Sequence, residues 1–85
     1  MMDRDKAIVR FIMVQRGDAV DLEIPLGLTA NELVTVLNKA YRLGIDTSDV
    51  KSCYFKAENP IALLRANKTL SEFGIRNGSR IYYTE

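Results

Sequence analysis

The sequence predicts an α+β fold of two layers, in which one amphipathic helix packs across a sheet of four or five strands. Residues 29–44 repeat apolar side chains at the period of a helix. Residues 7–15 and 19–24 are apolar or alternating runs on either side of a turn, which is typical of a β-hairpin. The remaining extended segments are residues 50–58, 61–64 and 79–84.

The predicted helix runs from Thr29 to Gly44. Thr29 and Glu32 have the spacing of a capping box, and Gly44 supplies a left-handed residue past the end. At ~100° per residue, one half of the circumference is apolar: Ala30, Leu33, Val34, Val36, Leu37, Ala40, Tyr41 and Leu43. The outer half is expected to be simply solvated, and it holds Asn31, Thr35, Asn38, Lys39 and Arg42.

The predicted hairpin joins strands Ala7–Gln15 and Ala19–Ile24 through the turn Arg16-Gly17-Asp18. Arg10 sets the orientation of the first strand, because a guanidinium is rarely buried without a partner. The inward residues are then Val9, Phe11 and Met13, followed on the second strand by Val20, Leu22 and Ile24. The outward residues are Ile8, Ile12 and Val14 beside Arg10, with Asp21 and Glu23 on the second strand.

The second half of the chain predicts shorter elements. A third strand, Val50–Glu58, ends at Asn59-Pro60, because proline cannot donate to a strand ladder. Ile61–Leu64 is a short strand, Lys68–Gly74 is expected to form a turn of 3₁₀ helix, and Ser79–Thr84 is the last strand. The residues expected to face inward are Cys53, Phe55, Ala57, Ile81 and Tyr83; those expected to face outward are Tyr54, Lys56 and Glu58. Leu70 and Phe73 are three residues apart and are expected to lie on one side of the 3₁₀ turn.

Composition argues against several kinds of function. The 85 residues contain no histidine and one cysteine, Cys53, whose position in its strand points inward. We therefore expect no enzyme activity, no cofactor and no metal site. Twelve basic and eleven acidic residues give a net charge of +1, which does not favour nucleic acid. No segment approaches the ~18–20 apolar residues that insert into a membrane, so we expect a reduced, cytoplasmic protein.

The segment KTLSEFGIRNGSRIYYTE, residues 68–85, resembles the close of a ubiquitin-like β-grasp domain. The matching residues are Thr69, Leu70, Ser71, Glu72, Phe73 and Ile75. Upstream, VDLEIPLGLTANELV is similar to the second strand and helix start of that fold. The resemblance implies a ubiquitin-like β-grasp, with a four- to five-stranded mixed sheet. It places one domain at residues 7–85, after a flexible N-terminus at residues 1–6.

Within that superfamily the sequence is similar to the YukD and EsaB proteins, ubiquitin-like components of Gram-positive type VII secretion systems. The pattern that carries this likeness is Gly74, Ile75, Asn77, Gly78 and Ile81. The family implies a cytoplasmic accessory protein that works with the membrane machinery exporting small helical WXG-type proteins. The partners it implies are the secretion ATPase or its membrane components.

The final strand ends at Tyr82-Tyr83-Thr84-Glu85 without a terminal Gly-Gly, which conjugation and sulfur carriage require. We therefore expect non-covalent binding of proteins by a monomer or a weak homodimer. The candidate surface is the exposed sheet face, with Ile8, Arg10, Ile12, Tyr54, Lys56, Arg80 and Tyr82. Two alternatives stay open: a modifier or sulfur carrier activated at its C-terminus, and a self-associating structural module.

Overall fold

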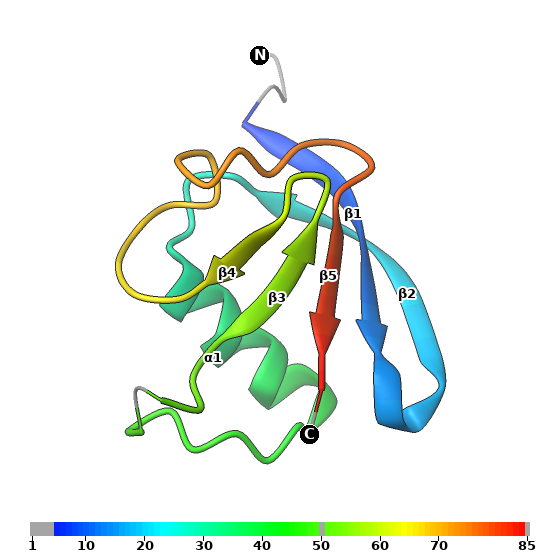
Figure 1. Cartoon of the computed structure of the whole chain (residues 1–85), viewed down its shortest axis with the longest axis vertical. Helices are drawn as coiled ribbons and strands as arrows, with labels where there is room; N and C mark the ends of the chain where they lie inside the picture. The colour runs from blue at the N-terminus through cyan, green and yellow to red at the C-terminus, as the bar shows by residue number, and fades with distance from the viewer. Residues whose placement is uncertain (1–4, 50, 85) are drawn as a thin grey trace.

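A computed structural model describes residues 5–49 and 51–84 and shows a five-stranded sheet with one helix packed across one of its faces (Figure 1). The elements are β1 (Lys6–Met13), η1 (Val14–Arg16), β2 (Asp18–Pro25), α1 (Ala30–Tyr41), β3 (Phe55–Glu58), β4 (Ala62–Leu64) and β5 (Arg80–Tyr83). The strand order is β2-β1-β5-β3-β4, and β1 and β5 are parallel while the other neighbours are antiparallel. The sheet is therefore mixed, as predicted.

The hairpin has the predicted faces but a shorter first strand. Val9, Phe11 and Met13 are buried, and Arg10 is exposed opposite Asp21. The strand ends at Met13, because the next three residues turn in a short 3₁₀ helix that Gly17 closes at a φ of 69°. The prediction that Val14 lies on the strand beside Arg10 is therefore wrong, although its side chain is 46% exposed.

The helix begins as predicted and ends three residues earlier. Thr29 Oγ1 accepts from the Glu32 amide at 3.1 Å, and Glu32 Oε1 accepts from the Thr29 amide at 2.9 Å, which completes the capping box. At the other end Arg42, not Gly44, takes the left-handed conformation next to the helix, with a φ of 53°. The carbonyls of Tyr41 and Arg42 accept from the Arg16 guanidinium at 2.7 Å each. A hairpin side chain thus satisfies the helix end that glycine was expected to close.

The buried stripe of α1 is narrower than the sequence predicts. Ala30, Leu33, Val34 and Leu37 are buried, and Tyr41 packs partly against the core, but Val36 is 53% exposed and Ala40 is also exposed. Both lie at the margin of the apolar half, on the flank where the sheet no longer covers the helix.

The outer half of the helix is not simply solvated. The Asn38 amide group donates to the Ile45 carbonyl and accepts from the Ile45 amide, both at 2.9 Å. Asn31 accepts from the Ala66 amide at 3.0 Å. These two asparagines hold the loops on either side of α1, so the prediction is wrong for them.

The C-terminal strands are shorter than predicted. Residues 51–53 form turns, so β3 begins at Phe55, and Val50 lies outside the described residues. Cys53, Phe55 and Ala57 are nevertheless buried as predicted. The strand predicted to begin at Ile61 begins at Ala62, and the last strand covers residues 80–83.

Residues 70–74 form successive turns and no 3₁₀ helix, and Thr69 before them forms a β-bridge with Thr29. The Phe73 amide bonds to the carbonyls of both Thr69 and Leu70, a mixture of helical spacings. Leu70 is buried, and Phe73 packs beside the core, so both side chains lie on the core side of this segment. Thr69 and Glu72 form a second pair of reciprocal cap bonds, at 2.9 and 3.2 Å.

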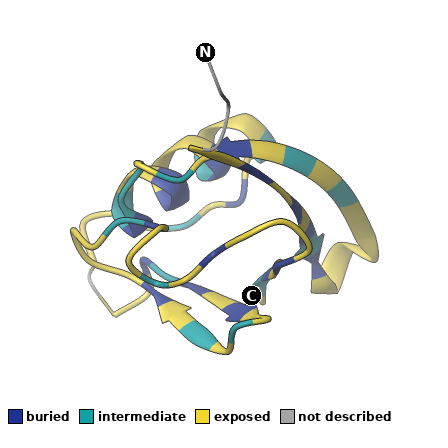
Figure 2. Cartoon of the chain, turned by 90° about the horizontal axis from the view of Figure 1, so that it is seen from above, coloured by how far each residue is buried: buried dark blue, intermediate teal, exposed yellow. Residues whose placement is uncertain are grey.

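The core lies between the sheet and α1, and the strands alternate buried and exposed residues (Figure 2). Its aromatic centre joins Phe11 to Phe55 with ring centroids 5.3 Å apart, and Tyr83 meets Phe55 edge-on at 6.2 Å. The Tyr83 hydroxyl donates to the Leu43 carbonyl at 2.7 Å.

Of the segment predicted to be flexible, residues 1–4 lie outside the described residues, and Lys6 is the first residue of β1. Residues 5–49 and 51–84 contain no helix with the length and hydrophobicity of a transmembrane span.

Candidate functional site on the outer face of the sheet

The candidate site is the outer face, by which we mean the sheet face opposite α1. One row across it is charged: Asp21, Arg10, Arg80 and Glu58 follow one another on β2, β1, β5 and β3. Arg10 pairs with Asp21 at 3.4 Å and Arg80 with Glu58 at 3.5 Å. These surface pairs contribute little stability, but they neutralise both arginines. The row therefore has no net charge.

The next row is mainly apolar. Ile12, Tyr82, Lys56 and Leu63 follow one another on β1, β5, β3 and β4. Lys56 takes part in neither of the two ion pairs found among the described residues. Its ammonium group is therefore the unbalanced positive charge of this row.

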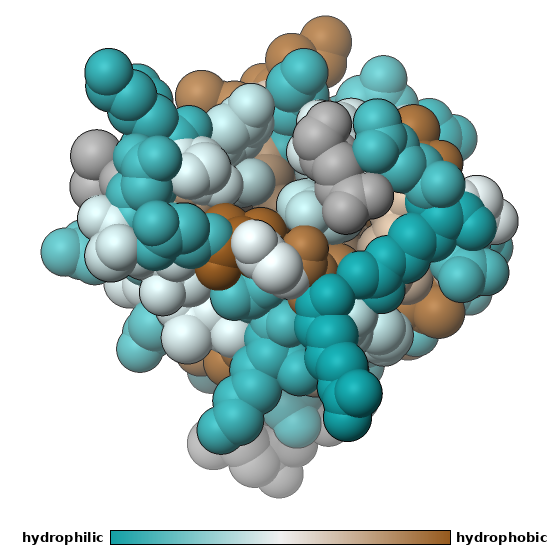
Figure 3. All heavy atoms as spheres, turned by 90° about the horizontal axis from the view of Figure 1, so that it is seen from below, coloured by the Kyte–Doolittle hydropathy of each residue, from teal (hydrophilic) through white to brown (hydrophobic). Residues whose placement is uncertain are grey.

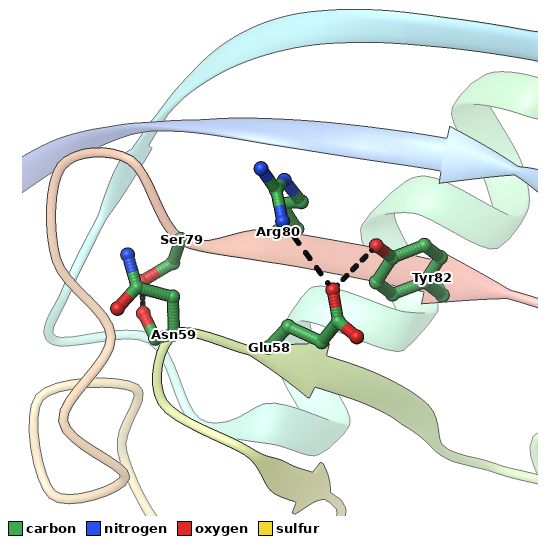
Figure 4. Close-up of polar contacts among 5 residues, drawn as sticks. All are labelled: Glu58, Asn59, Ser79, Arg80 and Tyr82. Carbon is green, nitrogen blue, oxygen red and sulfur yellow. Dashed lines mark hydrogen bonds and ion pairs between the residues drawn. The ribbon is translucent and has the colours of Figure 1, made fainter.

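Glu58 connects the two rows (Figure 4). Its Oε1 accepts from the Tyr82 hydroxyl at 2.7 Å and lies 3.5 Å from Arg80 Nη1. The hydrogen bond to Glu58 raises the pKa of Tyr82 above its usual range, and the same hydrogen bond holds the phenol hydroxyl beside Glu58. The Ser79 hydroxyl donates to the Asn59 carbonyl at 2.6 Å and so ties the start of β5 to the end of β3 (Figure 4).

A shallow groove of about 620 Å³ lies beside Tyr82, where β3 and β4 turn. Ile61, which is 91% exposed, and Leu63, which is 40% exposed, form its apolar wall. The complete lining is Lys56, Ala57, Glu58, Ile61, Ala62, Leu63, Tyr82 and Thr84. Seen from below, hydrophobic side chains reach the surface only in small areas among hydrophilic ones (Figure 3). On the outer face, the exposed side chains of Ile61 and Leu63 come together at this groove.

The structure brings most of the predicted site residues together. Arg10, Ile12, Lys56, Arg80 and Tyr82 share the centre of the outer face, although Ile12 and Tyr82 are half-buried and both arginines are paired.

The two remaining predicted residues lie toward opposite ends. Ile8 is 56% exposed and borders a hollow with Asn77 and Gly78. Tyr54 precedes β3 and lines another hollow with Lys56 and Tyr82.

The sequence prediction missed Ile61 and Leu63. Their segment, IALL, contains no polar residue to mark the outward side. Leu64 is buried, so alternation along β4 turns Leu63 outward. This alternation could have predicted that Leu63 is exposed, but only if the buried position of Leu64 had been known.

The arrangement offers apolar contact, hydrogen bonds and the ammonium group of Lys56, which suit the binding of a protein surface. Within residues 5–49 and 51–84, no group of three His, Cys, Asp or Glu side chains is placed to hold a metal ion. Cys53 is buried, and burial raises the pKa of its thiol, which disfavours the nucleophilic thiolate.

Comparison with known families identifies the chain. Residues 8–82 match the family described as "WXG100 protein secretion system (Wss), protein YukD". The chain belongs to the YukD family. The match covers the helix and all but the outermost residues of the sheet, and it confirms the resemblance found in the sequence. The comparison with curated proteins gave no match.

Solved structures similar to this YukD-family chain are ubiquitin-like domains. The C-terminal ubiquitin-like domain of mouse tubulin-specific chaperone e has a TM-score of 0.70 at 9% identity, over 96% of this chain and 88% of that one. A ubiquitin-like domain from tubulin-binding cofactor B has a TM-score of 0.71 at 19% identity, over 92% and 87%. The UBL domain of Plasmodium falciparum Dsk2 has a TM-score of 0.60 at 15% identity, over 93% and 99%. At these identities the likeness shows the fold alone, a ubiquitin-like β-grasp.

Proposed function

We propose that this YukD-family protein is a cytoplasmic accessory protein of a WXG-type secretion system and binds its protein partners non-covalently. The partners are the secretion ATPase or its membrane components, and the binding surface is the outer face of the sheet. The family match supports the secretion system, and the chemistry of the outer face supports the mode of action.

The observation that carries the proposal is the apolar row with its groove. Ile12 and Tyr82 are neighbours across the sheet, Leu63 follows on the far side of Lys56, and Ile61 extends the same surface past the end of β3. The neighbouring row is charged but neutral in sum. An apolar centre beside a polar margin is the usual anatomy of a protein interface.

Lys56, which takes part in neither ion pair of the described residues, adds a preference for an acidic partner group to this surface. A partner with a carboxylate beside an apolar side chain would pair with Lys56 while filling the groove. The Tyr82 hydroxyl donates to Glu58 Oε1 at 2.7 Å, and this hydrogen bond orders the Tyr82 side of the groove before a partner binds. Binding there therefore costs little side-chain entropy.

The test is co-purification of the secretion ATPase and its membrane partners with tagged chain from cells. Leu63→Asp and Tyr82→Ala should each reduce recovery of these partners about tenfold or more, because both remove apolar contact at the centre of the surface. Val14→Asp is the matched control, since Val14 is 46% exposed but lies on η1, past the end of β1, and does not line the groove. Thermal unfolding of each variant shows that it is folded.

Undiminished recovery with folded Leu63→Asp would contradict the proposed face. A covalent adduct at the C-terminus, found by mass spectrometry, would instead favour the modifier or carrier. Light scattering over a concentration series separates a monomer or weak homodimer from a self-associating structural module.

A further inference from the structure

The second feature that points to a partner is the free edge of the sheet at β2. β2 is the last strand in the sheet order, is eight residues long and, among the described residues, pairs with β1 alone. Seen from above, β2 forms the outer margin of the molecule, with exposed residues alternating with half-buried ones (Figure 2). An extended edge of this length is a template for strand addition.

The register identifies the backbone groups that this edge presents. Arg10 donates its amide to Ser79 at 3.0 Å, and Ile8 accepts from Gly78 at 3.0 Å, so the even-numbered residues of β1 bond toward β5. The odd-numbered residues of β1 therefore bond toward β2, and their partners there are Asp18, Val20, Leu22 and Ile24. The amide and carbonyl groups of Ala19, Asp21 and Glu23 consequently point outward.

The side chains along this edge are sorted by face. Asp21 and Glu23 lie on the outer face, and Glu23 takes part in neither ion pair of the described residues. On the inner face Val20 and Leu22 are only half-buried, since they lie at the margin of the core. An added strand would meet acidic side chains on one side and apolar side chains on the other.

The exposed helix flank continues the apolar side. Val36 is 53% exposed. At the helical period it lies on the flank of α1 opposite to Asn31 and Asn38, whose side chains bond to loops next to β4 and β3. Because β2 is at the opposite end of the sheet from β4, this flank faces the β2 side. Apolar side chains of an added strand would face Val20 and Leu22 at the core margin, and the exposed side chain of Val36 lies on the helix flank of that side.

We propose that the β2 edge binds an extended, basic segment of a partner protein by strand addition. Lysine or arginine at alternate positions lies beside Asp21 and Glu23, and apolar residues at the intervening positions face the margin of the core. This surface is separate from the outer-face groove, and the inference does not depend on the function proposed for that groove.

A second copy of the chain is a poor occupant of the same edge. Antiparallel pairing of two β2 strands about Asp21 sets Asp21 against Asp21, and pairing about Leu22 sets Asp21 against Glu23. Like charges directly opposite each other destabilise a strand pair. Charge complementarity therefore favours a basic partner segment.

The test uses a blocked peptide of alternating lysine and valine, seven residues long, added to the isotope-labelled chain. Amide hydrogen exchange by NMR should slow for Ala19, Asp21 and Glu23, by about tenfold when roughly 90% of the chain is bound. A peptide with glutamate in place of lysine is the charge control. A lysine peptide methylated on the amide nitrogens of its pairing edge is the backbone control, and neither should protect these amides.

Substitutions at positions 19 and 23 test the backbone and the charge of the edge separately. Ala19→Pro removes one outward donor without changing charge, and it should weaken binding of the lysine peptide, whereas Ala19→Thr should not. Glu23→Lys should lower the affinity for the lysine peptide about fivefold and raise the affinity for the glutamate peptide. This variant decides the test if Ala19→Pro does not fold.

The inference is overturned by any of three results. The first is that the lysine peptide causes no NMR chemical-shift change in residues 18–25. The second is that the methylated peptide binds as tightly as the unmodified one. The third is that protection of the same amides rises with the concentration of the chain when no peptide is present. The last result would assign the edge to a second copy. Co-purification through the outer face is a separate readout and does not decide this outcome.

Discussion

Replacing Ser79 by alanine tests how the sheet holds the outer face in place. Ser79 is fully buried, and its hydroxyl donates to the Asn59 carbonyl at 2.6 Å and accepts from the Arg76 amide at 3.0 Å. Alanine keeps nearly the same shape but leaves both backbone groups without this partner. Each unsatisfied buried group costs about 1–3 kcal/mol, and both of these hydrogen bonds are only partly buried, so we expect a loss of about 2–3 kcal/mol.

Urea unfolding followed by far-ultraviolet circular dichroism measures this loss. For a domain of this size it corresponds to a fall in Tm of about 10–20 °C. Ser71→Ala, at an exposed serine of the 70–74 turns, is the control and should change the free energy of unfolding by less than about 0.5 kcal/mol. If Ser79→Ala matched the control, the tie between β3 and β5 would contribute no net stability and the reasoning would be refuted.

Three further variants test the caps and the outer face. Arg16→Gln should lower the free energy of unfolding by about 1–2 kcal/mol in urea, because two carbonyls at the end of α1 lose a charged donor; an unchanged midpoint would contradict this. The amide and hydroxyl of Thr69 donate to Glu72 and lower its pKa in the folded protein below the unfolded value of 4.5. The ionised Glu72 therefore adds its full contribution to the free energy of unfolding above pH 4.5, and this contribution is lost as the pH falls through the folded pKa. Glu72→Gln should flatten the loss of stability in acid, measured as the urea midpoint against pH, and an unchanged slope would refute the assignment. Glu58→Gln should lower the pKa of Tyr82, measured by ultraviolet titration against a Tyr82→Phe reference, whereas an unmoved titration would show that Glu58 does not raise it.

Local patterns predicted the elements well where one residue fixed the side of a strand. Arg10 alone oriented β1, and the inward set from Val9 to Met13 followed from it. The Thr29–Glu32 spacing likewise gave the helix start, because a capping box depends only on residues three apart.

The predictions failed where distant segments decide the outcome. Arg16 closes the end of α1 across 25 residues of sequence, which no local pattern encodes. The width of the buried stripe on α1 depends on how far the sheet extends, so the exposure of Val36 and the loop contacts of Asn38 could not be read from periodicity.

The candidate site was predicted in its centre and missed at its margin. Lys56, Arg80 and Tyr82 stood out because charged and aromatic residues alternate with buried ones in their strands. Ile61 and Leu63 did not, because their segment is apolar on both sides and only the pairing with β3 turns Leu63 outward.

The most direct test of the central claim is photo-crosslinking in cells from a benzoylphenylalanine placed at position 63, with position 14 as the control. Leu63 lies in the outer-face groove, and Val14 is similarly exposed on η1 at the tip of the hairpin. The proposal predicts adducts with the secretion ATPase or its membrane components from position 63 and none from position 14. Adducts from position 14 alone, or none from position 63 in folded protein, would contradict it.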